Sequence, residues 1–190
     1  ADSLIYGNKC KANGGGVFLD NGGIVRNCTI AGNSAYYGGG VYSGYVYNCI
    51  VVRNTTRNTS SPSPVTGSVY YSCLDVMVSG TGNICSEPNF VDETNGDFRI
   101  RLDSPCVDAG NDSYVFEATD FLGNPRQVGP VDMGAYEYQL GTAIDIQPDV
   151  LSPGTVCTPY SAKLTASGGT SPYSWRVATA VTEPGLREFE

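Results

Sequence analysis

The chain has 190 residues, with 24 glycines, 11 prolines and a formal net charge of −8. This composition favours many short strands and turns over long helices. The 11 basic residues are scattered singly, so the sequence offers no basic stripe to a nucleic acid or an anionic membrane surface. There is no histidine, which excludes a Ser-His-Asp triad and removes the commonest metal ligand.

The cysteines and the hydropathy indicate a compartment. Seven cysteines without a CxxC pair favour an oxidising environment, so we expect a secreted, extracellular or cell-surface protein. Because seven is odd, at least one thiol has no partner within the chain. The sequence has no apolar run of the roughly 18 residues that would suggest a membrane span, so no membrane insertion is expected in this segment.

A repeated stretch organises the first part of the chain. The segment GNKCKANGGGVF at 7–18 returns as GNSAYYGGGVY at 32–42, and VRNCTIAGN at 25–33 returns as VYNCIVVRN at 46–54. A period in this range, with short apolar strands and Gly or Asn at the corners, predicts a parallel β-helix of about three to four coils. Residues 1–75 form the predicted coils, and the fold class is all-β.

Equivalent positions can be aligned between the coils. The pairs expected to stack as strands are Leu4-Ile5 with Thr29-Ile30 and Ile50-Val51, Val17-Phe18 with Val41-Tyr42, and Ile24-Val25 with Tyr45-Val46. Asn8, Asn33 and Asn54 end the turns that follow the first strands, and we expect them to stack as an asparagine ladder.

Cysteines recur in the same way. Cys28 and Cys49 occupy one register, and Cys73 looks like the same position one coil later. A ladder of reduced, buried side chains is favoured for Cys28 and Cys49, with a disulfide as the alternative. Residues 57–68, rich in Ser, Pro and Thr, are expected to leave the coil as an excursion.

The period is lost from about residue 76. Two short strands are expected, at Asn89–Val91 and Phe98–Leu102, and the segment 118–139 is expected to supply the final strands. Residues 76–138 are therefore interpreted as the last coils and a C-terminal cap that closes the open end of the solenoid, whose strand edges would otherwise stay unpaired.

Four motifs in this region carry a resemblance to a known family. GNICSEPNFVD, GDFRIRLDSPCVDAGN, DFLGNPRQ and VDMGAYEYQ resemble the C-terminal signature of bacterial secreted right-handed β-helix proteins, often called choice-of-anchor or polymorphic-outer-membrane-protein-like. The resemblance covers about residues 1–139 and implies a structural role without a catalytic set. It implies that the cap is tied together by Asp108, Asp120, Arg126, Asp132 and Glu137. It also implies a disulfide between Cys73 and Cys106, with Cys85 as a rival partner.

The end of the chain reads differently. Residues 139–147 are interpreted as a linker, and residues 148–190 resemble the opening strands of immunoglobulin-like modules of bacterial surface proteins. Tyr160, Ala162, Leu164 and Ala166 alternate as in a strand with one buried face, and Trp175 would be the core aromatic. A complete sandwich needs about 80–100 residues, so an incomplete β-sandwich segment is expected. Both ends of the chain look continued by further chain or by neighbouring molecules.

No catalytic group recurs among the repeats. No two carboxylates share a register, and the acidic segment DETNGD at 92–97 reads as a turn although it faintly resembles a calcium loop, so no metal and no cofactor are expected. Exposed tyrosines could stack on sugars or on a partner surface, with a structural aromatic ladder as the alternative. These tyrosines are Tyr36, Tyr37, Tyr45 and Tyr47.

The sequence therefore predicts a non-catalytic extracellular module for adhesion, display or a stalk. Its partners would be polysaccharide or another surface protein. Two alternatives stay open: the non-catalytic part of a polysaccharide-active β-helix enzyme, and a filament subunit that self-associates through open strand edges.

Overall fold

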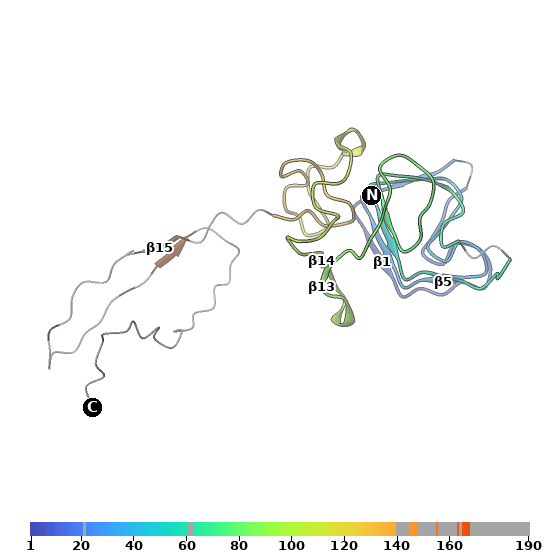
Figure 1. Cartoon of the computed structure of the whole chain (residues 1–190), viewed down its shortest axis with the longest axis horizontal. Coiled ribbons are helices and arrows are strands. Elements are labelled where there is room, and N and C mark those ends of the chain that lie inside the picture. The colour runs from blue at the N-terminus through green and yellow to red at the C-terminus, as the bar shows by residue number, and fades with distance from the viewer. Residues whose placement is uncertain are drawn as a thin grey trace, which may run out of the picture. The chain divides into compact units, whose positions relative to one another are not determined.

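The computed structural model describes residues 1–20, 22–60, 63–139, 145–147, 155, 163 and 165–167. The chain divides into two units, Ala1–Gln139 and Leu140–Glu190. The described residues form strands and two short 3-10 helices and contain no α-helix (Figure 1). The all-β prediction is confirmed, and the first unit is a parallel β-solenoid of about three turns.

The solenoid consists of parallel strands stacked from coil to coil. Its main sheet has five strands in the order β1 (Leu4–Tyr6), β4 (Thr29–Ala31), β8 (Ile50–Val52), β11 (Cys73–Leu74) and β12 (Ile84–Cys85). A second sheet has the order β10 (Ser68–Tyr70), β7 (Tyr45–Tyr47) and β3 (Ile24–Arg26). Two parallel pairs complete the wall: β2 (Val17–Phe18) with β6 (Val41–Tyr42), and β5 (Ser34–Ala35) with β9 (Thr55–Thr56).

The register agrees with the alignment of the repeats. Leu4 pairs with Thr29, which pairs with Ile50 in the next coil, so the predicted first strands are confirmed residue by residue. Tight stacking also explains a glycine corner, because a Cβ on Gly15 would lie 2.2 Å from the carbonyl oxygen of Gly39. Glycine is therefore required there by the approach of two backbones.

The alignment of Cys73 was wrong by one position. Cys73 pairs with Ile50, and Ser72 occupies the place equivalent to Cys49, whose N–H donates to the Ser72 hydroxyl at 3.0 Å. Because side chains alternate between the two faces of a strand, a shift of one residue moves Cys73 from the interior of the solenoid to its outer face.

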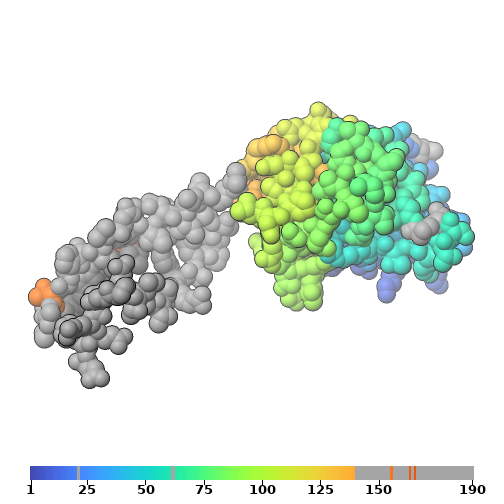
Figure 2. All heavy atoms as spheres, in the orientation of Figure 1, coloured from blue at the N-terminus to red at the C-terminus, as the bar shows by residue number. Residues whose placement is uncertain are grey.

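We call residues 88–139 the lateral cover. It begins with the antiparallel hairpin of β13 (Phe90–Asp92) and β14 (Asp97–Ile100), joined through the 3-10 helix η1 (Glu93–Asn95), and continues through η2 (Asp112–Tyr114). The two strands lie close to the expected positions, and the 92–97 segment is the turn between them. The cover lies along the outside of the five-stranded sheet, so the expectation that it closes the end of the solenoid was wrong (Figures 1 and 2).

The three central strands of the five-stranded sheet, β4, β8 and β11, are consequently buried on both faces. Ile30, Val51 and Leu74 point into the solenoid, where they pack with the inward side chains of the other strands. Ile50 and Cys73 point outward and pack against the cover. Sheets covered on both faces read as continuous apolar runs, and β8, with the sequence IVV, is buried at all three positions.

The expectation of final strands at 118–139 was also wrong. The described residues between 101 and 139 form turns and the short helix η2, and many of their backbone N–H groups donate to side-chain oxygens. Buried backbone groups need such partners where no sheet supplies them. The cover is therefore held together by specific polar side chains, whereas the solenoid is held together by strand pairing.

The second unit is described at few positions. Strand β15 (Asp145–Gln147) pairs antiparallel with β16 (Thr165–Ser167). The predicted linker 139–147 therefore ends in a strand. Cys157, Tyr160, Ala162, Leu164 and Trp175 lie outside the described residues, so the immunoglobulin-like interpretation stays a prediction.

Candidate functional site: the junction between the solenoid and the lateral cover

Arg126 is the central charged residue of the junction. Its side chain is 1% exposed, and its Nη2 atom donates to the carbonyl oxygens of Asp132 and Gly134, both at 2.9 Å. Its Nε atom lies 3.2 Å from Oδ1 of Asp2, and its Nη1 atom lies 4.0 Å from Oε2 of Glu137. One guanidinium thus links the first coil to two segments of the cover, a geometry suited to its planar set of donors.

Three carboxylates organise the backbone of the cover. Asp132 accepts from the N–H groups of Asp108, at 2.7 Å, and Tyr138. Glu137 accepts from the N–H groups of Val128 at 2.9 Å and Asp132 at 3.1 Å. These bonds are charge-assisted when the carboxyl is ionised, and they replace strand pairing in this part of the chain.

Asp120 completes this arrangement. Its Oδ1 atom accepts from the N–H groups of Leu122 and Asn124, both at 2.9 Å, and its Oδ2 atom accepts from the N–H of Glu137 at 3.1 Å. The structure thus brings together the five residues that the family resemblance implied for the cap. Asp108 contributes its backbone N–H.

Burial perturbs the acids of the junction. Desolvation raises the pKa of Asp132 to about 6, although the N–H groups of Tyr138 and Asp108 oppose it. Desolvation also raises the pKa of Glu137 to about 7, against the N–H groups of Val128 and Asp132. The proximity of Asp132 to Glu137 adds to the rise. Both acids therefore titrate closer to neutral pH than free carboxyls.

Sequence reasoning missed Asp2, Arg26 and Glu117. Nη2 of Arg26 lies 2.9 Å from Oε1 of Glu117, and the carboxyl of Asp2 contacts that of Glu117. Desolvation raises the pKa of Asp2 to about 6, with Arg126 opposing and Glu117 contributing. Burial acts to raise the pKa of Glu117 as well, but Arg26 outweighs it and the pKa is lowered. No repeat marks these three residues, so nothing in the sequence pointed to their role.

The asparagine ladder is present in the solenoid. Nδ2 of Asn8 donates to Oδ1 of Asn33 at 3.0 Å, and Nδ2 of Asn33 donates to Oδ1 of Asn54 at 3.0 Å. The backbone N–H groups of Asn8 and Asn33 donate to the same two oxygens, both at 2.9 Å. Asn33 also donates to the carbonyl oxygen of Ile5 at 3.0 Å. The ladder therefore ties both side chains and backbone from coil to coil.

A second asparagine pair connects the solenoid to the cover. Asn27 and Asn48 are buried, have positive φ values of 51° and 50°, and are bonded through Asn48 Nδ2 to Asn27 Oδ1 at 3.1 Å. Asn48 also donates to the carbonyl oxygen of Asn111 at 3.0 Å and accepts from its N–H at 2.8 Å. Asparagine tolerates positive φ better than most residues. The spacing of 21 residues between the two was visible in the sequence, but their role at the junction was not.

Gly134 lets the cover approach the sheet. Its N–H donates to the carbonyl oxygen of Asn48 at 2.8 Å, and the next N–H, of Ala135, donates to Oγ1 of Thr29 at 3.0 Å. A Cβ on Gly134 would lie 2.7 Å from Ile50 and 2.9 Å from Oγ1 of Thr29. With φ at 103°, the position is also unfavourable for other residues.

The expected disulfide between Cys73 and Cys106 is not formed. Both are free thiols, although they are buried together between the sheet and the cover and hydrogen-bond to each other. The contact with Cys106 lowers the pKa of the Cys73 thiol. The contact with Cys73, together with burial, raises the pKa of the Cys106 thiol. Cys73 Sγ also donates to the carbonyl oxygen of Ser86 at 3.2 Å. Cys85, the rival partner, is exposed and free.

Cys28 and Cys49 are likewise free and buried inside the solenoid. The proximity of the Cys49 thiol lowers the pKa of Cys28 to about 7, whereas burial raises the pKa of Cys49 well above its ordinary value. The structure therefore has the reduced ladder and not the alternative disulfide.

The four tyrosines fall into two groups. Tyr36 and Tyr37 form an edge-to-face pair, with centroids 4.9 Å apart, and are 47% and 36% exposed. Tyr45 is 42% exposed, but Tyr47 is half-buried and stacks on Tyr114 of the cover at 4.0 Å. Tyr47 thus packs at the junction, whereas the other three leave ring surface open to a partner.

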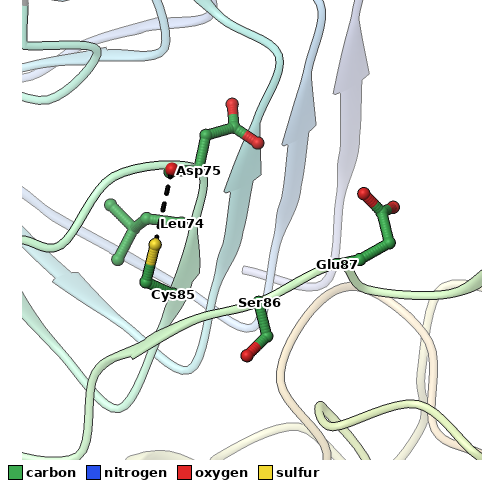
Figure 3. A pocket seen from close by; sticks show the side chains of 5 residues that line it. All are labelled: Leu74, Asp75, Cys85, Ser86 and Glu87. Atoms are coloured by element: carbon green, nitrogen blue, oxygen red, sulfur yellow. Dashed lines mark hydrogen bonds between the residues drawn. The ribbon is translucent and has the colours of Figure 1, made fainter.

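A shallow pocket of about 250 Å³ lies beside β11 and β12. Figure 3 shows the side chains of Asp75 and Glu87 on either side of it, with the thiol of Cys85 directed at the carbonyl oxygen of Asp75 at 3.4 Å. The N–H of Arg53 donates to Asp75, and its guanidinium pairs with Glu87 at 2.5 Å and Glu93 at 2.9 Å. One arginine thus already engages the carboxylates here.

Comparisons of the chain with family models, curated proteins and solved structures found no match. Within the described ranges, no group of three or more Cys, Asp or Glu residues is placed to hold a metal ion. Those ranges also contain no helix of the length and apolarity that a membrane span requires. The fold and the junction define a class: a parallel β-solenoid whose main sheet is covered laterally by a segment held by polar side chains.

Proposed function

We propose that this chain is a structural module of an extracellular or cell-surface protein, serving as a stalk, for display or for adhesion, without catalytic activity of its own. The observation that carries the proposal is what the polar side chains of the junction contact. Arg126, Asp120, Asp132 and Glu137 bind the backbone of their own chain. Asn33 of the ladder and Asn48 of the second asparagine pair do the same. Groups engaged in this way hold a surface in place.

The exposed tyrosines support the adhesive part of the proposal. Tyr36, Tyr37 and Tyr45 present partly open rings on a scaffold whose coils fix their positions. An aromatic ring can stack on the apolar face of a sugar or pack against a protein. Polysaccharide or another surface protein is therefore the proposed partner.

Surface display tests the proposal. The chain is placed between a membrane anchor and an epitope tag on bacterial cells, beside a Gly/Ser linker of equal length as the control. A structural module should present the tag and protect residues 1–139 from a protease that removes the control tag. Cleavage of both at equal rates would argue against a rigid module, and release of sugar products from a polysaccharide panel would overturn the non-catalytic assignment.

A second candidate, self-assembly, is favoured by the ends of the main sheet. β1 and β12 each pair with one neighbouring strand within the described residues, and such edges can accept a strand of another molecule. Light scattering over a wide concentration range tests it. A mass that stays monomeric throughout would refute self-assembly without touching the stalk assignment.

A further inference from the structure

The junction holds buried polar atoms without a hydrogen-bond partner among the described residues. They comprise both carboxyl oxygens of Asp2, Oε2 of Glu117, Nε of Arg26, and Nε and Nη1 of Arg126. The side chains of Arg126 and Asp2 are only 1% and 9% exposed. Nε of Arg126 and Oδ1 of Asp2 still form an ion pair at 3.2 Å, but buried polar atoms without a hydrogen bond are costly, and the cost depends on whether each acid is ionised. The cluster therefore links the stability of this contact to protonation.

The balance of charge at the junction also makes this contact depend on protonation. Asp2, Glu117 and Glu137 face the guanidinium groups of Arg26 and Arg126; Asp2 and Glu137 are buried, whereas Glu117 is 34% exposed. Full ionisation therefore leaves more negative than positive charge around the buried carboxyl of Asp2. Two carboxyls in contact do not readily ionise together. The side chains that face the Asp2 and Glu117 pair are the thiol of Cys28 and the guanidinium groups of Arg26 and Arg126.

We propose that Asp2 and Glu117 share one proton at mildly acidic pH, and that this proton latches the first coil of the solenoid to the lateral cover. The shared proton lets one carboxyl donate to the other, while Arg26 and Arg126 neutralise the remaining charges. Above the transition both acids are ionised and repel each other across the contact. This device goes beyond the proposed function and does not depend on it.

The pH dependence of the latch follows from the direction in which the pKa of Asp2 is shifted. The folded chain raises the pKa of Asp2 from 3.8 to about 6, so it binds the proton more tightly than the unfolded chain does. The latch is fully formed below the ordinary pKa of Asp and is lost as the pH rises through about 6. Asp132 and Glu137 are raised in the same direction, so the pH dependence of the unmodified chain cannot by itself identify the latch.

A substitution at Asp2 separates its contribution to the pH dependence from those of Asp132 and Glu137. Asp2→Asn gives a side chain that carries no charge and donates at any pH, while Glu117 keeps its ion pair with Arg26. The matched control is Asp20→Asn, because Asp20 is exposed and lies outside the junction. Amide hydrogen exchange of Gly134 and Ala135 reports the contact directly, since these N–H groups donate from the cover to Asn48 and Thr29.

In the full chain and in Asp20→Asn, we expect the protection of these two amides, corrected for intrinsic exchange, to fall about tenfold or more between pH 5 and pH 8. In Asp2→Asn the fall should be at least several-fold smaller. An equal fall in Asp2→Asn and Asp20→Asn would overturn the latch. Carbon-13 NMR titration of the Asp2 carboxyl in the unmodified chain decides independently of whether the variant folds, because a midpoint near that of a free Asp would also overturn it.

Discussion

The solenoid and the lateral cover are stabilised in different ways. In the solenoid each side chain meets its own equivalent in the next coil, as Asn33 meets Asn8 and Asn54, and the polar contacts of the ladder are between neutral amides. In the cover each contact occurs once and many involve charge, as in the bonds of Arg126 and Glu137. Repetition therefore makes the solenoid tolerant of local change, whereas the cover depends on a few irreplaceable groups.

The two regions also differ in the sequence separation of their contacts. The bonds of the asparagine ladder join residues 21 and 25 positions apart, whereas Asn48 bonds to Asn111, 63 positions away, and Ala135 bonds to Thr29, 106 positions away. Closing a longer loop costs more entropy before any contact compensates for it. We therefore expect the coils to form before the cover docks, which makes the junction the place to disturb.

The largest effect is expected from Arg126→Met. The substitution leaves Asp2 and Glu137 buried without a counter-charge and the carbonyl oxygens of Asp132 and Gly134 without a donor. Losing one partner of a buried ion pair costs about 3–5 kcal/mol, and urea unfolding followed by circular dichroism measures it. Arg99→Met is the control, because Arg99 is 53% exposed. Equal stability of the two variants would contradict the central role of Arg126.

Leu74→Ala should have a slightly smaller effect on the solenoid itself. Leu74 is fully buried and packs inside the coils, on the face of β11 opposite to the cover. Truncating a buried leucine costs about 2–5 kcal/mol, including the cavity left behind. Leu102→Ala removes a side chain that is 65% exposed and should cost little. If the coils and the cover unfold as separate steps, Leu74→Ala should lower the midpoint of the coil transition.

The ladder predicts an ordered pair of effects. Asn33→Ala removes both side-chain contacts with Asn8 and Asn54 and leaves the carbonyl oxygen of Ile5 without this donor. A buried polar group that loses its partner costs about 1–3 kcal/mol. Asn8→Ala, at the exposed end of the ladder, should cost clearly less. Thermal unfolding of both variants tests the order, and equal melting temperatures would show that the ladder is not a continuous support.

The same contrast explains what the sequence could predict. The strands, their register and the asparagine ladder were predictable because repetition displays each contact twice or more. The lateral position of the cover was less accessible, although the unbroken apolar run of β8 was a signal that both faces of the sheet are buried. The roles of Asp2, Glu117 and Asn48 could not be predicted, because their partners are single residues far away in the sequence. Cys73 was misplaced because the coils differ in length near it, so a one-residue shift changed its face.

The smallest effect is expected from Arg53→Ala. Arg53 pairs with Glu87 and Glu93, but its side chain is 36% exposed and that of Glu87 is 62% exposed, so water screens the attraction. Exposed ion pairs typically contribute no more than about 1 kcal/mol. The loss should shrink further in high salt, whereas the loss caused by Arg126→Met should persist because the Arg126 pairs are buried. Urea unfolding of both variants at low and high salt tests this, and a large, salt-independent loss for Arg53→Ala would show that the pocket beside β12 is a second buried junction.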